Sequence, residues 1–338
     1  MNMGKFKTFY KSNSIVKRTV LVLLFIALAV PAGVLYAENI LIQADKQTYD
    51  GERTVFEGNV KVDYEDIRVE SPKAIVRNDE KGKPNAATFV DGAYAEKNSE
   101  FTRSEVKANI INLSLLKNRI RAEGNAESSV FENKKPIVHI KAGSQIFDIK
   151  KNVIVAEENV KINYEKIDTL SDKARISINK EGNLDRVEFL GNVEINQDQS
   201  IIRAQNVLYN PNTDEMVASG STRSTTVLDD KNNVVIWADF QQYDNLSKTL
   251  ITSGHVKIKY KDYIATGPKA TFIPDNNSSK PNKIVFIGRS RIQEGQRYVE
   301  ADRIQMTVDP KNFKAEGNVK TRFTQVQSYK DMNKEKDS

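Results

Sequence analysis

The chain has 338 residues, no cysteine and a formal net charge of +6. Five basic residues precede residue 20, where there is no acid, so 46 of the 51 basic residues remain against 45 acidic ones. This near-neutral body lacks the basic field on which nucleic-acid binding depends. Without cysteine there are no disulfides, so backbone pairing and apolar burial must hold the fold together.

The N-terminal segment has the three parts of a secretory signal peptide. The five basic residues precede an uncharged run from Thr19 to Val30, which Pro31 and then Ala37 follow before the first acid. We therefore predict that residues 1–37 are a signal peptide cleaved after Ala37. The alternative is an uncleaved anchor, because the uncharged stretch of 19 residues could span a bilayer. Both interpretations place the body of the protein outside the cytoplasm.

The body that follows repeats one short strand pattern, Phe56-Glu57-Gly58-Asn59-Val60-Lys61-Val62. Apolar residues alternate with polar ones, and a Gly-Asn pair stands where a strand bends. Steps of 29 to 34 residues separate the related positions. These are Gly58, Gly92, Gly124, Glu158, Gly191, Gly220, Gly254, Gly288 and Gly317. A period near 32 residues predicts a repeat architecture of about nine units, each with about four short strands.

A second signature, an apolar residue followed by Ala and often by Asp, recurs between the Gly-Asn strands, as in Ile42-Gln43-Ala44-Asp45. Equivalent aspartates are Asp172, Asp239 and Asp302. A catalytic acid pair should be peculiar to one unit, whereas a residue reused in each unit usually serves a turn. We therefore predict that the protein is not an enzyme, and the alternative of a solenoid glycosidase requires one unique acid pair.

Side-chain alternation predicts which residues face inward. Phe56, Val60 and Val62 share one parity, and Glu57 and Lys61 take the other. A glycine inside a strand can mark a bulge, which would shift this parity. One apolar face per unit favours two facing antiparallel sheets, or one sheet folded into a V, around an apolar groove. The predicted groove-lining residues are Phe56, Val60, Val62, Phe189, Val193, Ile195, Val256, Ile258 and Phe286.

Motifs for metals, phosphates and nucleotides are missing from the sequence. Its two histidines, His139 and His255, lie in different units, and His255 replaces the Asn of a Gly-Asn pair as an expected solvated turn residue. We predict no metal site and no cofactor. Trp237, the single tryptophan, has the parity of the outer face and is expected to be a half-covered surface aromatic.

The repeated Gly-Asn-Val strand and the pattern Ala44-Asp45 followed by Tyr49-Asp50 resemble the OstA-like periplasmic proteins of lipopolysaccharide transport, the LptA family, with the LptC proteins related. The resemblance covers about Asn39 to Phe323. It implies an elongated V-shaped β-jellyroll that carries the lipid A acyl chains of lipopolysaccharide in its groove. It also implies a periplasmic bridge between inner-membrane LptC-like and outer-membrane LptD-like proteins, made by end-to-end strand pairing that also permits head-to-tail self-association.

The predicted organisation is therefore all-β. We expect a jellyroll over residues 38–326, as one body or as two stacked halves joined near residue 180, and a disordered polar tail over 327–338. Two alternative functions stay open. One is an inner-membrane-anchored LptC-like component of the same pathway, and the other is an exported β-solenoid adhesin with a fully packed core.

Overall fold

The computed structural model describes residues 41–64, 67–98, 102–114, 116–132, 134–148, 150–164, 167–179, 184–197, 200–229, 232–244, 246–274, 281–307 and 312–323. The predicted signal peptide and the predicted C-terminal tail lie outside these residues. The described residues contain no helix that could span a membrane.

The described residues form strands and turns without any helix, which confirms the all-β prediction. They divide into a first unit, residues 41–218, and a second unit, residues 219–323. Strands of the first unit are β1 (Leu41–Gln43), β2 (Lys46–Tyr49), β3 (Arg53–Tyr64), β4 (Ile67–Asn78), β5 (Pro84–Val90), β6 (Ala93–Asn98), β7 (Thr102–Ala108), β8 (Ile110–Ser114), β9 (Arg119–Glu132), β10 (Lys135–Asp148), β11 (Val153–Tyr164), β12 (Ile167–Ile178), β13 (Leu184–Gln197) and β14 (Ser200–Asn210).

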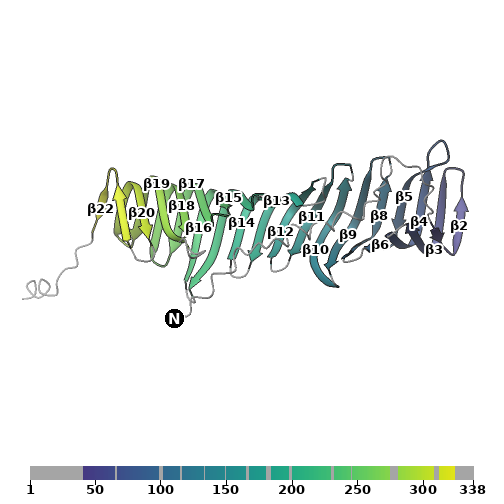
Figure 1. The fold of residues 1–338 in the computed structure, drawn as a ribbon, viewed down its shortest axis with the longest axis horizontal. Helices are drawn as coiled ribbons and strands as arrows, with labels where there is room; N and C mark the ends of the chain where they lie inside the picture. Colours follow the sequence, from purple (N-terminus) through teal and green to yellow (C-terminus); the bar gives the residue numbers. More distant parts are fainter. Residues whose placement is uncertain are drawn as a thin grey trace, which may run out of the picture. The chain divides into compact units, whose positions relative to one another are not determined.

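The division between the units falls inside β15 (Glu215–Asp229). The second unit continues with β16 (Asn232–Asp244), β17 (Thr249–Tyr260), β18 (Tyr263–Pro274), β19 (Pro281–Glu294), β20 (Arg297–Thr307), β21 (Asn312–Glu316) and β22 (Lys320–Arg322). Within each unit, most long strands lie beside the strand that follows them in sequence (Figure 1), whereas β5 pairs with β8 and β7 pairs with β9. Their pairing is antiparallel, as between β11 and β12 in the first unit and between β17 and β18 in the second.

Each repeat is built mainly from two long strands that bend in their middle, where the sequence predicts about four short ones. At the bend of β3 the register with β4 shifts between Glu57 and Val60. The predicted repeat positions from Gly58 to Gly317 are these bends, and all nine have a positive φ between 70° and 96°. Only glycine adopts such a backbone without steric cost, which is why glycine marks the period. We call each bend a corner.

The two sequence signatures are the two sides of one corner. Asn59 Nδ2 donates a hydrogen bond to Asp45 Oδ2 at 3.0 Å, and a Cβ atom on Gly58 would lie 2.8 Å from the Cβ of Asp45. Equivalent bonds join Asn192 to Asp172 at 2.9 Å and Asn318 to Asp302 at 2.7 Å. The recurring aspartate therefore packs against the recurring glycine, as its recurrence in the sequence predicts for a turn residue.

One corner is built with the two residue types exchanged. Glu158 occupies the position of the glycine, with φ of 70°, and Gly143 of β10 occupies the position of the aspartate. A Cβ atom on Gly143 would lie 2.7 Å from the Cβ of Glu158. The close approach of the two strands therefore requires one residue without a side chain, but either strand can supply it.

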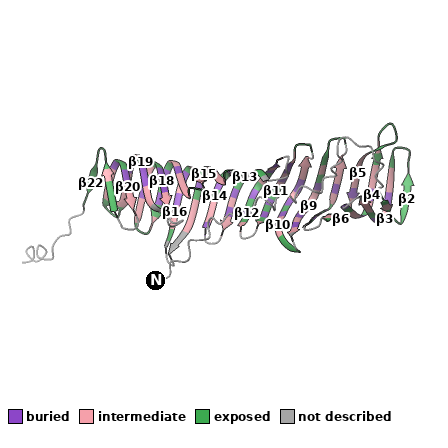
Figure 2. Ribbon diagram, viewed as in Figure 1, coloured by how far each residue is buried: buried purple, intermediate pink, exposed green. Residues whose placement is uncertain are grey.

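Corners divide every unit into two layers. In β3, residues 53–57 belong to layer A and residues 60–64 to layer B; in the antiparallel β4, residues 67–71 belong to layer B and 73–78 to layer A. Figure 2 shows buried and exposed positions alternating along the strands. On β3 the inward parity survives the corner, from Phe56 to Val60. On β4 it changes, because Ser71 and Ala74 are both buried, so the predicted parity shift falls on the partner strand.

Candidate functional site

The nine predicted groove residues all belong to, or pack against, buried apolar clusters. Three of them, Phe56, Val60 and the partly buried Val62, come from β3 and belong to one cluster. Three others, Phe189, Val193 and Ile195, come from β13 and belong to a second. Val256, Ile258 and Phe286 lie in a third cluster, in the second unit. The clusters combine residues of both layers, as Phe56 and Val60 show. The structure thus brings the predicted residues together in three groups.

The side chains on the inner face become larger and more exposed with distance from the corner. In β14, Ala204 and Val207 flank the corner and are buried, whereas Ile202 and Tyr209 farther along are only partly buried. Phe147, Tyr164 and Met216 are similar partly buried residues at the margin of the same cluster. Small side chains let the layers meet at the corner, and large apolar ones stand towards the ends of the strands. The accessible part of the inner face is therefore apolar.

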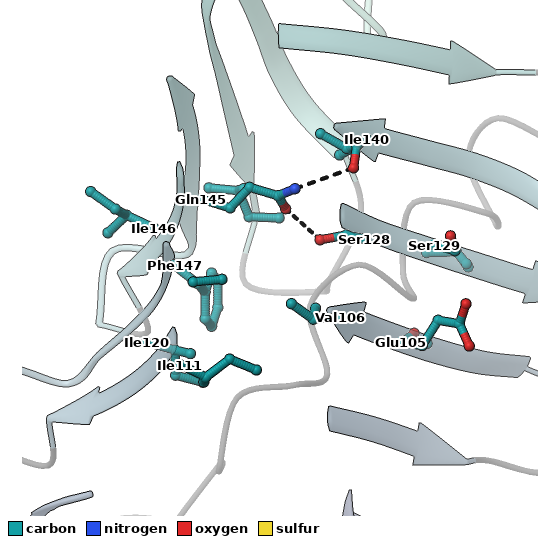
Figure 3. A pocket seen from close by; sticks show the side chains of 14 residues that line it. Glu105, Val106, Ile111, Ile120, Ser128, Ser129, Ile140, Gln145, Ile146 and Phe147 are labelled. Atoms are coloured by element: carbon teal, nitrogen blue, oxygen red, sulfur yellow. Dashed lines mark hydrogen bonds between the residues drawn. The ribbon is translucent and has the colours of Figure 1, made fainter. Parts of the chain in front are cut away.

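A buried glutamine ties the two layers together in the first unit (Figure 3). Gln145, only 8% exposed, extends from layer A of β10. Its Nε2 donates to the backbone oxygens of Ala126 at 3.0 Å and Ile140 at 3.2 Å, both in layer B, and its Oε1 accepts from Ser128 Oγ. We call Gln145 and Ser128 the first clasp. It lies where the first apolar cluster ends, at Ala126, and the second begins.

A second clasp has the same construction and lies in the second unit. Gln241 Nε2 donates to Thr222 Oγ1 at 2.9 Å and to the oxygen of Ile236 at 3.4 Å, while Ser224 Oγ donates to Gln241 Oε1 at 2.9 Å. Gln241 and Ser224 each follow their counterparts by 96 residues, which is three periods. Buried polar groups that are fully hydrogen-bonded rigidify a core. Both clasps therefore fix the spacing of the layers where they stand.

A small cavity adjoins the first clasp. Its volume is about 60 Å³, and its lining includes the apolar Val106, Ile120 and Phe147 beside Gln145. Val106, Ile111, Ile120 and Phe147 extend towards it in Figure 3. Ligand pockets usually enclose roughly 300–1,000 Å³. Beside the first clasp, therefore, the side chains of the two layers leave less space than a typical ligand pocket has.

A polar pair joins two strands at the corner of β17. Asp239 accepts a hydrogen bond at its corner from His255 Nδ1 at 2.7 Å, and the His255 side chain is 92% exposed, as expected for a solvated turn residue. The described part of the chain has no group of three or more His, Cys, Asp or Glu that could hold a metal ion. Inside, the dominant chemistry is apolar contact, which suits aliphatic chains.

On the outer face of the first unit, layer B carries paired charges. Lys141 Nζ bonds Glu127 Oε1 at 2.7 Å, and this hydrogen bond lowers the pKa of Glu127 below its ordinary value. Nearby, burial and then a hydrogen bond to Glu96 raise the pKa of Tyr94 to about 12. The carboxylates here are matched by cations on neighbouring strands.

Sequence analysis missed the two clasps. It assigned inward positions by their apolar character, and Ser128, Gln145, Ser224 and Gln241 are polar at inward positions. The recurrence of Ser and Gln at a spacing of 96 residues was the available signal. A polar pair that recurs at inward parity indicates a buried hydrogen bond.

The described residues, with no helix and with an apolar interior between two sheet layers, place the protein in the class of repetitive β-proteins. The chain matches the family described as LptA/(LptD N-terminal domain) LPS transport protein over residues 41–137 and 182–275, more than half of its length. It belongs to that family, which confirms the resemblance found in the repeats. Each matched segment contains three corners, and the unmatched stretch between them contains the exchanged corner. The protein is thus a lipopolysaccharide transport protein.

Among solved structures, the chain is similar to LptH, the LptA homologous periplasmic component of the lipopolysaccharide transport device from Pseudomonas aeruginosa. The match has 16% identity and a TM-score of 0.33, and it covers 38% of this chain and 96% of that one. A comparison with curated protein sequences gives no match.

Proposed function

We propose that the protein is a non-enzymatic periplasmic carrier that binds the acyl chains of lipopolysaccharide between layers A and B and bridges the inner and outer membranes. The observation that carries the proposal is the apolar inner face, whose large residues stand partly exposed away from the corners, as Ile202 and Tyr209 do. Membership of the lipopolysaccharide transport family supports this choice of ligand.

Binding then requires the layers to separate at the strand ends. Outside the clasps most of the buried residues are apolar, with some Ser and Thr among them, so an acyl chain can replace side-chain contacts by contacts of largely the same kind. Each buried methylene contributes about 0.8 kcal/mol, which offsets the loss of contact between the layers. Near Gln145 and Gln241 separation also breaks buried hydrogen bonds. We infer that acyl chains lie in the apolar stretches on either side of a clasp.

The end strands suit the bridging role. Among the described strands, β1 and β2 pair only with β3, and β21 and β22 pair only with β20. Their outer edges keep backbone groups that can pair with another strand. We propose that LptC-like and LptD-like partners, or further copies of this chain, add at these edges. The LptC-like alternative differs in retaining residues 1–37 as an anchor, which mass spectrometry of the mature N-terminus decides.

The test uses purified protein with lipopolysaccharide and with a deacylated form that has the same sugars. We expect binding of the first only, and transfer of it between two vesicle populations. Ile202 faces inward and its neighbour Ile201 outward, and both are partly buried. Ile202→Glu should weaken binding by about tenfold or more, since a charge against apolar chains costs over 1.4 kcal/mol, whereas Ile201→Glu should not. Equal binding of the deacylated form contradicts the proposal.

The closed packing around the 60 Å³ cavity favours a second candidate, an exported β-solenoid adhesin with a fully packed core. In that case the delipidated protein takes up no fluorescent acyl probe. Saturable uptake that Ile202→Glu reduces excludes this candidate.

A further inference from the structure

The outer face of layer B in the second unit differs in charge from its counterpart in the first. Pairing register and exposure identify its outward residues. Among those whose side chains the structure describes, Glu300 is the one acidic residue. We call the basic ones the basic face: Arg223, Lys257, Lys259, Arg291, Lys320 and Arg322.

In the first unit the same face is balanced. Register places seven basic and seven acidic residues outward on layer B there. The basic ones are Lys61, Arg68, Arg103, Lys107, Lys141, Lys161 and Arg203, and the acidic ones are Asp63, Glu70, Glu96, Glu105, Glu127, Asp168 and Glu194. The excess of cations therefore belongs to the second unit.

Equivalent positions show how the change arises. Glu127 and Lys141, which form an ion pair in the first unit, correspond at a spacing of 96 residues to Arg223 and Trp237. Arg223 lies 5.6 Å and Lys257 5.5 Å from the Trp237 ring centre. The second unit thus has a cation, Arg223, where the first has the carboxylate of Glu127, and an aromatic ring, Trp237, where the first has the cation of Lys141. Both cations lie in cation–π range and are not neutralised by the ring.

The rest of the basic face is arranged in two rows across neighbouring strands. One row runs from Trp237 to Lys257 and on to Arg291, and the other from Val235 through Lys259 and Ile264. Arg291 shares Glu300 with Arg289, at 3.4 Å and 3.7 Å. Lys257, Lys259, Lys320 and Arg322 form no ion pair with a described carboxylate.

We propose that the basic face docks the protein on the surface of a bilayer that contains anionic lipids. The side of a sheet is broad enough for several cations to approach a membrane together. Trp237, Val235 and Ile264 interleave with them, and aromatic residues favour the membrane–water interface. Each Lys or Arg near an anionic surface contributes about fivefold in affinity, so several together give salt-sensitive docking. This inference concerns a membrane surface and is independent of the acyl-chain cargo.

The experiment is co-sedimentation of the exported protein with phosphatidylcholine vesicles, with and without phosphatidylglycerol and free of lipopolysaccharide. Binding should require phosphatidylglycerol and weaken with salt. The variant Arg223→Gln/Lys257→Gln/Lys259→Gln should lose on the order of 100-fold in affinity. The matched control Lys107→Gln/Lys141→Gln/Lys161→Gln, on the first unit, should change it by about twofold at most. All variants share one N-terminus, so differences report on these residues.

Equal binding to both kinds of vesicle, or an equal loss in the control, overturns the proposal. So does salt-dependent binding to polyglutamate, lost in the first variant, without binding to vesicles, because the face would then serve an acidic protein. Trp237 fluorescence on denaturation checks that the variants fold. Lipopolysaccharide binding in detergent-free solution tests the cargo separately, so the two proposals can fail independently.

Discussion

The two units of this protein share their inside and differ on their outside. Gln145 and Ser128 in the first unit recur as Gln241 and Ser224 in the second, and each glutamine bonds its serine and the backbone oxygen of an equivalent isoleucine. Outside, the charges of layer B are balanced in one unit and basic in the other. A shared interior indicates a common task along the chain, and a divergent surface indicates contacts particular to one unit.

The largest expected effect tests whether the corners are equivalent. Gly191 and Gly254 have φ of 73° and 74°, and a Cβ on either would clash with Asp172 or Asp239. Gly191→Ala and Gly254→Ala should each lower the free energy of unfolding by about 3 kcal/mol, from backbone strain and overpacking. Denaturant unfolding measures this, with Trp237 fluorescence for the second unit and circular dichroism for both.

Gly82 provides the control for this comparison. Its φ is 76°, but nothing lies within 4 Å of an added Cβ. Gly82→Ala should cost only about 1 kcal/mol. A loss as large as that of Gly191→Ala would show that the aspartate contact does not matter. Clearly unequal losses at Gly191 and Gly254 would show that the two units are built differently.

At the exchanged corner, a side chain added on the aspartate side should destabilise the protein, and a glycine placed on the other side should restore its stability. Gly143→Asp places a side chain against Glu158 and should cost about 2 kcal/mol by overpacking. Adding Glu158→Gly restores the usual order of residue types and should recover most of the loss. Thermal unfolding of the single and double variants measures this coupling. Additive losses would contradict the close contact.

The clasps should contribute equally in the two units. Gln145→Leu and Gln241→Leu leave buried hydrogen-bonding groups without partners, so each should lower the free energy of unfolding by about 1.5 kcal/mol. The exposed Gln205 is the control, since Gln205→Leu should stay within about 0.5 kcal/mol. No loss at either clasp would mean that it does not hold the layers together.

The smallest effect concerns the outer face of the first unit. Tyr94 has its pKa raised to about 12, first by burial and then by Glu96. As the pH rises, the phenol of Tyr94 therefore ionises in the unfolded state first and stays protonated longer in the folded state. The resulting stability is complete below about pH 10 and is lost as the pH rises towards 12. Ultraviolet titration should show a late-ionising tyrosine that Tyr94→Phe removes; an unchanged titration curve contradicts the assignment.

The repeating elements of the fold were predictable from the sequence because each is local. Gly58 and Asn59 mark a corner through backbone conformation, and Val60 and Val62 reveal their inward side through alternation. The contact between Asp45 and Gly58 was not predicted, although both signatures were noticed, because it joins different strands. Gly143 and Glu158 were harder still, since each breaks the local pattern and only their pairing explains them.

The candidate site was predicted in part. Its apolar residues, such as Phe189 and Val193, follow from periodicity. Gln145 and Gln241 do not follow from periodicity, because a polar residue at an inward position interrupts the alternation of apolar and polar residues along its strand. The basic face was concealed by the near-neutral total charge, which averages over two units of different surface.

Photo-crosslinking in cells tests most directly the claim that acyl chains lie between the layers. The pairs Ile195 and Glu194, and Ile258 and Lys257, each place an inward residue beside an outward one. A photoreactive residue at Ile195 or Ile258 should capture lipopolysaccharide, and one at Glu194 or Lys257 should not. Equal capture from both faces, or none from the inward positions of a folded protein, would contradict the account.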